Sequence, residues 1–305
     1  MFRKTIVVIL AICIVALSGC SLVTAPAGDS VIATSFYPVY IFTLNLVDGI
    51  DGVTVMCMAE QSVGCLHDYT ITAKDARIID DADVLVINGA GMELFVEDIY
   101  TSAENLTVID SSEGVELLCG DSHEGHDHHD HEGHSHEYNS HIWMSVGNAK
   151  IQVTNIKNGL IEKFPQFKEK IESNYDDYMM RLDALAEDID EASQYVNDKP
   201  VMTFHDAYAY LAEDMGFHVV STVESGEGGE PSAMELASLS NEINEHGVKA
   251  LFIEPDYSGS AAEILFRETG VEIYTLNPVI KGDAVKTAYE DIMRKNIESI
   301  VEAVK

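Results

Sequence analysis

Residues 164–196 read FPQFKEKIESNYDDYMMRLDALAEDIDEASQYV and predict one long amphipathic helix. Pro165 suits the first turn of a helix, because the N–H that proline lacks has no partner there. The apolar residues of this stretch follow each other at steps of three and four, which places them on one buried stripe. They are Phe164, Phe167, Ile171, Tyr175, Tyr178, Leu182, Leu185, Ile189 and Ala192. At 1.5 Å per residue the helix spans about 45 Å, which is long enough to run the length of a two-lobed molecule.

Short apolar strands alternate with helical stretches on both sides of this helix. Before it, we predict strands at 31–36, 53–58 and 84–88, and helices at 37–47, 71–81, from about Met92, and at 146–164. After it, we predict strands at 201–204, 218–223, 250–253 and 271–275, and helices at 206–215, 234–246, 261–269 and 284–304. Such alternation is typical of a mainly parallel sheet flanked by helices. The predicted fold is therefore α/β, with lobes at 31–163 and 197–305 joined by the helix of 164–196.

The first thirty residues have the pattern of an export signal and a tether. Arg3 and Lys4 precede an apolar run at 6–17 that is short for a membrane span, which predicts a signal peptide at 1–19. The end of that run, LSGC, resembles a bacterial lipobox, and the resemblance implies cleavage before a lipid-bearing Cys20. Residues 20–30 would then tether the fold to the outer face of the cytoplasmic membrane. An uncleaved anchor helix would leave the domain on the same face.

The formal net charge is -34. This value excludes nucleic acid as a partner, because phosphate binding needs a basic surface. An acidic surface attracts cations, although solubility or a salty medium explains the charge equally well.

Three cysteines remain beyond the signal and the lipidation position: Cys57, Cys65 and Cys119. An extracytoplasmic location permits one disulfide with one thiol left over, and the sequence does not decide the pairing. The chain has no CxxC motif, so a zinc site made of thiolates is not expected.

Seven of the twelve histidines lie within residues 121–140, DSHEGHDHHDHEGHSHEYNS. They are His123, His126, His128, His129, His131, His134 and His136. The stretch has almost no apolar residue to bury, so it predicts a solvated loop whose imidazoles suit a borderline-soft divalent cation. An expression tag or a neutral spacer is the alternative, but a tag would lie at a terminus and lack the interleaved Asp127, Asp130 and Glu132.

Three of the other five histidines lie where a ligand is expected. His67 lies in the loop after the strand of 53–58, His205 directly follows the strand of 201–204, and His141 lies where the histidine-rich loop returns to the fold. Ligands of open α/β sheets collect beyond the carboxyl ends of the strands. The last two histidines have structural explanations. His218 begins a strand, and His246 lies in the last turn of a helix, where the helix dipole favours a cation.

These residues also carry a resemblance to a known family. The chain resembles the solute-binding lipoproteins of ABC importers for zinc and manganese. The matching stretches cover nearly all of the mature chain: TSFYPVY, GCLHDYTITAKDARIIDDADVLVINGAGME, SHIWMS, TFHDAYAYLAEDMGF, GEPSAMEL and IEPDYSGSAAEILFRETG. The resemblance implies two α/β lobes on one rigid helix with the metal in the cleft between them.

By position, the resemblance implies His67, His141 and His205 as the first three metal ligands. A histidine at the third position is similar to the zinc branch, and neutral imidazoles suit zinc while hard oxygen ligands suit manganese. The fourth family position, usually an aspartate, falls at Asn277, which offers only a neutral oxygen, so water or another carboxylate would complete the site. Asp68 and Asp206 follow ligand histidines and are candidates to orient imidazoles, while a helix cap is the alternative role for Asp206.

The sequence therefore predicts a monomeric, extracytoplasmic zinc receptor, not an enzyme, that delivers Zn²⁺ to an ABC permease and its ATPase. A receptor for manganese or another divalent metal, or an adhesin-type surface lipoprotein, is the alternative. A zinc hydrolase is disfavoured because HExxH and GxSxG motifs are absent. The histidine-rich loop is interpreted as an accessory that scavenges or senses zinc, or as a passive insert.

Overall fold

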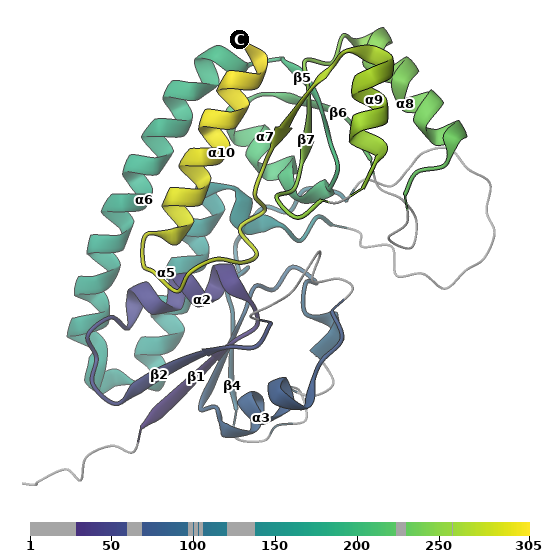
Figure 1. Cartoon of the computed structure of the whole chain (residues 1–305). Coiled ribbons are helices and arrows are strands. Elements are labelled where there is room, and N and C mark those ends of the chain that lie inside the picture. Colours follow the sequence, from purple (N-terminus) through teal and green to yellow (C-terminus); the bar gives the residue numbers. More distant parts are fainter. Residues whose placement is uncertain are drawn as a thin grey trace, which may run out of the picture.

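The computed structural model describes residues 29–59, 69–96, 100, 103, 106–120, 138–223, 230–257 and 259–305. In these residues two four-stranded sheets lie in separate lobes, which are joined along one side by a long helix (Figure 1). Every strand pair is parallel. The predicted two-lobed α/β fold is confirmed. The predicted signal peptide and Cys20 lie outside the described residues, and within the described part no helix is long and apolar enough to cross a membrane.

The sheet of the N-terminal lobe has the strand order β2-β1-β3-β4. Its elements are β1 (Ser30–Thr34), α2 (Tyr37–Leu46), β2 (Val53–Cys57), α3 (Ala73–Asp81), β3 (Val84–Ile87) and β4 (Thr107–Asp110). Strand β4 was not predicted; it is an edge strand of four residues that buries only Ile109. So short a run with one buried side chain carries almost no periodic signal. The helix expected from about Met92 is a single 3₁₀ turn, Leu94–Val96.

The sheet of the C-terminal lobe has the strand order β6-β5-β7-β8, and its four strands match the predicted ones. Its elements are β5 (Pro200–Thr203), α7 (Ala209–Met215), β6 (His218–Thr222), α8 (Ala233–His246), β7 (Ala250–Ile253), α9 (Ala261–Thr269), β8 (Glu272–Thr275) and α10 (Ala288–Val304). The last helix begins four residues later than predicted. The segment before it extends to the N-terminal lobe, where the Tyr37 hydroxyl donates to the Asp283 carbonyl at 2.7 Å.

The linking helix is α6 (Lys168–Val196), which follows α5 (Val146–Lys163) and a 3₁₀ turn at Pro165–Phe167. Its buried residues are Ile171, Asn174, Tyr178, Leu182, Leu185, Ile189, Ala192 and Val196, so the predicted stripe is confirmed over most of its length. The helix contacts α2 and α5 as well as α7 and α10. One hydrophobic core therefore runs from the N-terminal lobe through α6 into the C-terminal lobe.

Helix α8 begins with a capping box, whose contribution to stability can be measured by mutation. Ser232 Oγ accepts the Glu235 N–H at 3.3 Å, and Glu235 Oε2 accepts the Ser232 N–H at 2.7 Å. Ser232→Ala is expected to lower the free energy of unfolding by about 1 kcal/mol, because one N–H of the first turn loses its acceptor. Ser238→Ala, an exposed change in the middle of the same helix, serves as the control in urea unfolding. Equal effects of the two variants would contradict a capping role.

Candidate metal centre

His141 and His205 come from opposite lobes and lie against each other. His141 precedes the 3₁₀ helix η3 (Ile142–Met144) and is 4% exposed, whereas His205 is the second residue after β5. Their ring centroids are 4.9 Å apart, with the rings perpendicular. Two of the three histidines predicted as ligands are thus adjacent, as expected for side chains that share one ion.

The His141 ring is held by Asn139. Its Nδ1 lies 2.9 Å from Asn139 Oδ1, which also accepts the His141 backbone N–H at 2.9 Å. The Asn139 amide nitrogen donates to the carbonyl of Asp206 at 2.8 Å and to Asp206 Oδ2 at 3.0 Å. Because the amide donors point to Asp206, the amide oxygen faces His141 and Nδ1 is the protonated nitrogen. Asp206 therefore acts on His141 of the opposite lobe, through Asn139.

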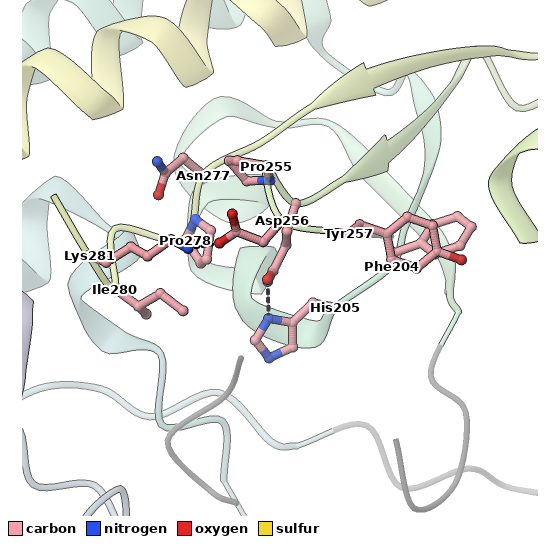
Figure 2. A pocket seen from close by; sticks show the side chains of 10 residues that line it. Phe204, His205, Pro255, Asp256, Tyr257, Asn277, Pro278, Ile280 and Lys281 are labelled. Atoms are coloured by element: carbon pink, nitrogen blue, oxygen red, sulfur yellow. Dashed lines mark hydrogen bonds and ion pairs between the residues drawn. The ribbon is translucent and has the colours of Figure 1, made fainter. Parts of the chain in front are cut away.

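The His205 ring is held by Glu254, the residue after β7. His205 Nδ1 and Glu254 Oε1 are 2.5 Å apart, and the dashed line in Figure 2 marks this contact. A metal-bound imidazole commonly donates its second N–H to a carboxylate or carbonyl in this way. In both histidines Nδ1 has an outer acceptor, so Nε2 is the nitrogen that would bind an ion.

His205 and Glu254 line a cavity of about 220 Å³ in the C-terminal lobe (Figure 2). The other lining residues are Phe204, Pro255, Asp256, Tyr257, Asn277, Pro278, Ile280 and Lys281. Asp256 forms an ion pair with Lys281. The predicted fourth ligand, Asn277, is in this cavity, but its Oδ1 already accepts the N–H of Val279 at 2.8 Å. This bond closes a turn from Asn277 to Val279, and Val279 has a left-handed φ of 60°.

Several predicted site residues lie outside the described residues: His67, Asp68 and all seven histidines of the loop. The ends of that loop are described, and Cys119 and Tyr138 pair in an antiparallel bridge directly before Asn139. Among the described residues, no three His, Cys, Asp or Glu side chains are grouped so that they could hold a metal ion. His218 and His246 are exposed, which agrees with their structural explanation. No disulfide joins the described Cys57 and Cys119, so the pairing with Cys65 stays open.

A buried carboxylate organises the strand ends of the N-terminal lobe beneath His141. Glu93 is 3% exposed and accepts hydrogen bonds from Ser35 Oγ at 2.7 Å, from the Asn88 N–H at 2.6 Å and from the Gly89 N–H at 3.0 Å. The Asn88 side chain in turn donates to the carbonyl of Ser140, the neighbour of His141. Burial raises the pKa of Glu93 to about 7, although its three donors oppose that rise.

The raised pKa of Glu93 predicts a pH-dependent stability. Between the unfolded value of 4.5 and the folded value of about 7, the folded state holds a proton that the unfolded state has released. The contribution of Glu93 to the free energy of unfolding therefore falls by about 3 kcal/mol as pH rises through this window. Glu93→Gln cannot titrate, so it removes this pH-dependent loss of stability. Because the amide has only one acceptor oxygen, the variant is destabilised by an amount that does not change with pH. Urea unfolding at pH 5 and pH 8 measures it, and equal pH slopes for both proteins would contradict the prediction.

Two parallel-sheet lobes on one long helix, with a histidine from each lobe meeting between them, define the class of metal-binding solute receptors with a rigid linker. The chain belongs to the ZnuA family, the zinc-uptake complex component A, periplasmic, whose model matches residues 32–303. The predicted family is thus confirmed.

Two curated relatives and one solved structure show the extent of this similarity. The high-affinity zinc uptake system protein ZnuA of Bacillus subtilis is 32% identical over 286 residues, which cover 91% of this chain and 88% of the relative. The zinc-binding protein AdcA of Streptococcus pyogenes is 30% identical over 289 residues, covering 90% of this chain but only 56% of AdcA. The Zn(II)-bound ZnuA-like domain of Streptococcus pneumoniae AdcA superposes with a TM-score of 0.76 at 27% identity, covering 91% of this chain and 99% of that domain.

Glu254 and Asn139 were not predicted from the sequence as site residues. Glu254 directly follows the predicted strand of 250–253, so the strand-end rule that selected His205 would also have selected it. Asn139 lies two residues before His141, and asparagine commonly accepts the N–H of the second residue after it. The sequence thus contains a signal for each of the two residues.

Proposed function

We propose that this chain is an extracytoplasmic receptor that binds Zn²⁺ with high affinity between its lobes and delivers it to an ABC permease for import. The observation that carries this proposal is the His141–His205 pair, whose rings from opposite lobes lie 4.9 Å apart. Neutral imidazoles are preferred ligands of zinc. The family membership and the zinc-binding relatives support the same cargo.

In this proposal the zinc ion is cargo, and the chain is a receptor without enzymatic activity. His67, His141 and His205 bind the ion. Because the ligands come from both lobes, they can share one ion only if the lobes keep their relative position. The shared hydrophobic core around α6 maintains that position. Asn277 contributes weakly at most, because its oxygen is engaged in the turn at Val279.

We place the receptor on the outer face of the cytoplasmic membrane, anchored through a lipid on Cys20, as a monomer that docks on the permease, whose ATPase completes the importer. The lipobox-like LSGC supports the anchor. The pneumococcal relative that is 30% identical is named a zinc-binding lipoprotein, and its match covers 98% of this chain and 60% of the relative.

A competition titration with a chromophoric zinc chelator tests the proposal. The full mature chain is expected to take one tight equivalent of Zn²⁺ and to prefer it over Mn²⁺, and His67→Ala is expected to lose that equivalent. Unchanged affinity in His67→Ala would show that the site is assigned wrongly. A preference for Mn²⁺ would favour the manganese receptor instead.

We further propose that the histidine-rich loop is an accessory that holds several weaker, exchanging zinc ions. Deleting residues 121–137 while keeping Tyr138, the partner of Cys119, is expected to leave the tight equivalent and remove the weaker ones. The weaker ones are also expected to dissociate near pH 6, where imidazole takes up a proton. Elemental analysis of both proteins from metal-replete cells measures the difference, and loss of the tight equivalent would contradict an accessory role.

A further inference from the structure

We propose that Glu254 is a positioning residue of the zinc site: its carboxylate holds the His205 ring through Nδ1 and supplies the negative charge that Asn277 lacks. This inference rests on the zinc-binding function proposed above. It concerns a residue that acts through His205 and is not itself a ligand.

The backbone fixes Glu254 and His205 relative to each other. Strand β5 pairs with β7, and Glu254 is the first residue after β7 while His205 is the second after β5. The Phe204 N–H donates to the Phe252 carbonyl at 2.9 Å, which extends the pairing to the residue before His205. The Leu276 N–H donates to the Ile253 carbonyl at 2.9 Å on the other side of β7. The carboxylate is thus presented to the ring from a paired sheet, and a rigid support is what an outer partner of a ligand needs.

The charge of Glu254 is effective because the contact is shielded. The His205 and Glu254 side chains are 15% and 21% exposed. At such burial the attraction between a carboxylate and a bound cation is weakened little by salt.

The other polar residues of the cavity are occupied elsewhere. Asp256 pairs with Lys281, so the positive charge of the lysine offsets its carboxylate. Asn277 is neutral and its oxygen accepts the Val279 N–H. Its backbone N–H and carbonyl are both held by the Asn296 side chain at 2.8 Å. Of the two carboxylates that line the cavity, Glu254 is the one directed at a histidine.

The two histidines are therefore unequal ligands. His205 donates Nδ1–H to a carboxylate, which makes its Nε2 a stronger donor to a metal ion, whereas His141 donates to the neutral amide of Asn139. A carboxylate behind an imidazole gives the site part of the anionic character that a direct aspartate ligand would give.

The test compares Glu254→Gln with Asp256→Asn, a change that removes one charge from the same cavity but faces a lysine. Zinc affinity is measured by chelator competition on the full chain. Glu254→Gln is expected to weaken zinc binding by about 10- to 100-fold, and Asp256→Asn by less than about threefold, with thermal midpoints close to that of the parent. Spectroscopy of the His205 ring gives a second readout. In the metal-free parent at about pH 8, the ¹⁵N signals of the His205 ring are expected to show a protonated Nδ1. In Glu254→Gln the same ring signals are expected to show a mixture of tautomers. The Co²⁺ absorption spectrum is expected to keep its shape.

Three results would overturn the inference: zinc affinity of Glu254→Gln within threefold of the parent, a protonated Nε2 at His205 in the parent, or a Co²⁺ spectrum showing that a direct ligand was lost. His205→Ala, measured in parallel, separates this failure from failure of the site. If His205→Ala loses zinc while Glu254→Gln keeps it, the site stands and the positioning role fails. If neither variant loses zinc, the proposed site itself is wrong.

Discussion

Replacing His205 with alanine is expected to weaken zinc binding by a factor on the order of a thousand. Loss of a residue that only orients a ligand costs about 10- to 100-fold, so loss of the ligand itself costs more. His205→Ala removes a side chain from the edge of a cavity and takes the Nδ1–H donor from Glu254, so we expect the free energy of unfolding of the metal-free protein to fall by about 1 kcal/mol. His141→Ala is expected to weaken binding as strongly. It also lowers stability, because His141 is 4% exposed and its loss leaves Asn139 Oδ1 with fewer donors.

His218→Ala and His246→Ala are the matched controls for this prediction, because both remove an exposed histidine away from the site. Their zinc affinity at the tight equivalent is expected to equal that of the parent. Isothermal titration with a competing chelator measures all four variants. A His205→Ala protein that binds zinc within tenfold of the parent would contradict the assignment.

The fold could be predicted from the sequence wherever a periodic pattern was long enough. Helix α6 repeats its apolar step through eight turns, and each buried strand of the C-terminal lobe is bounded by turn residues. The start of α10 could not be predicted, because distant groups decide it. The Lys286 carbonyl accepts hydrogen bonds from Asn45 Nδ2 at 3.0 Å and Arg181 Nη1 at 3.2 Å. These hydrogen bonds from α2 and α6 engage the Lys286 carbonyl and keep the chain before α10 out of the helix.

The site was predictable as far as single residues at strand ends. His205 was selected in that way and His141 by its place at the return of the histidine-rich loop, and the structure brings the two together. Asn139 and Glu254 each had a local signal, but the long-range pairings could not be read from the sequence, because Glu254 is 49 residues from His205 and Asp206 is 67 residues from Asn139. The role of Asp206 could not be predicted from its neighbours in the sequence. It was considered as an orienting residue or a helix cap, and its carboxylate in fact reaches the opposite lobe.

The lobes are held together by polar contacts as well as by the shared core. Asn139 reaches Asp206, the Tyr37 hydroxyl donates to Asp283, and Lys286 pairs with Asp48 at 2.6 Å. The core beneath them includes the rings of Phe42 and Tyr289, 5.1 Å apart across the lobes. Local unfolding of one lobe would break all of these contacts. We therefore expect one cooperative unfolding transition for the whole described fold.

Trp143 is one of the residues that couple the lobes, through both a hydrogen bond and a packed ring. Its ring is fully buried, lies edge-on to Phe36 with centroids 4.8 Å apart, and donates its Nε1–H to the Pro278 carbonyl of the other lobe at 2.8 Å. Trp143→Ala is expected to lower the free energy of unfolding by about 3–5 kcal/mol, because it opens a large cavity and leaves a buried carbonyl without its donor. Zinc affinity is expected to fall as well, since the ring packs beside His141 at 5.2 Å.

Two further variants separate packing from the hydrogen bond between the lobes. Trp143→Phe retains part of the ring but no N–H, and is expected to cost about 1–3 kcal/mol from the unpaired carbonyl and lost volume. Tyr195→Ala removes an aromatic ring that is 57% exposed on α6, and is expected to change stability by less than about 0.5 kcal/mol. Urea unfolding followed by circular dichroism measures all three, since Trp143 is the sole tryptophan and its fluorescence is lost on substitution. A Trp143→Ala protein as stable as Tyr195→Ala, or a parent that unfolds in two separate transitions, would show that the lobes are not coupled through this residue.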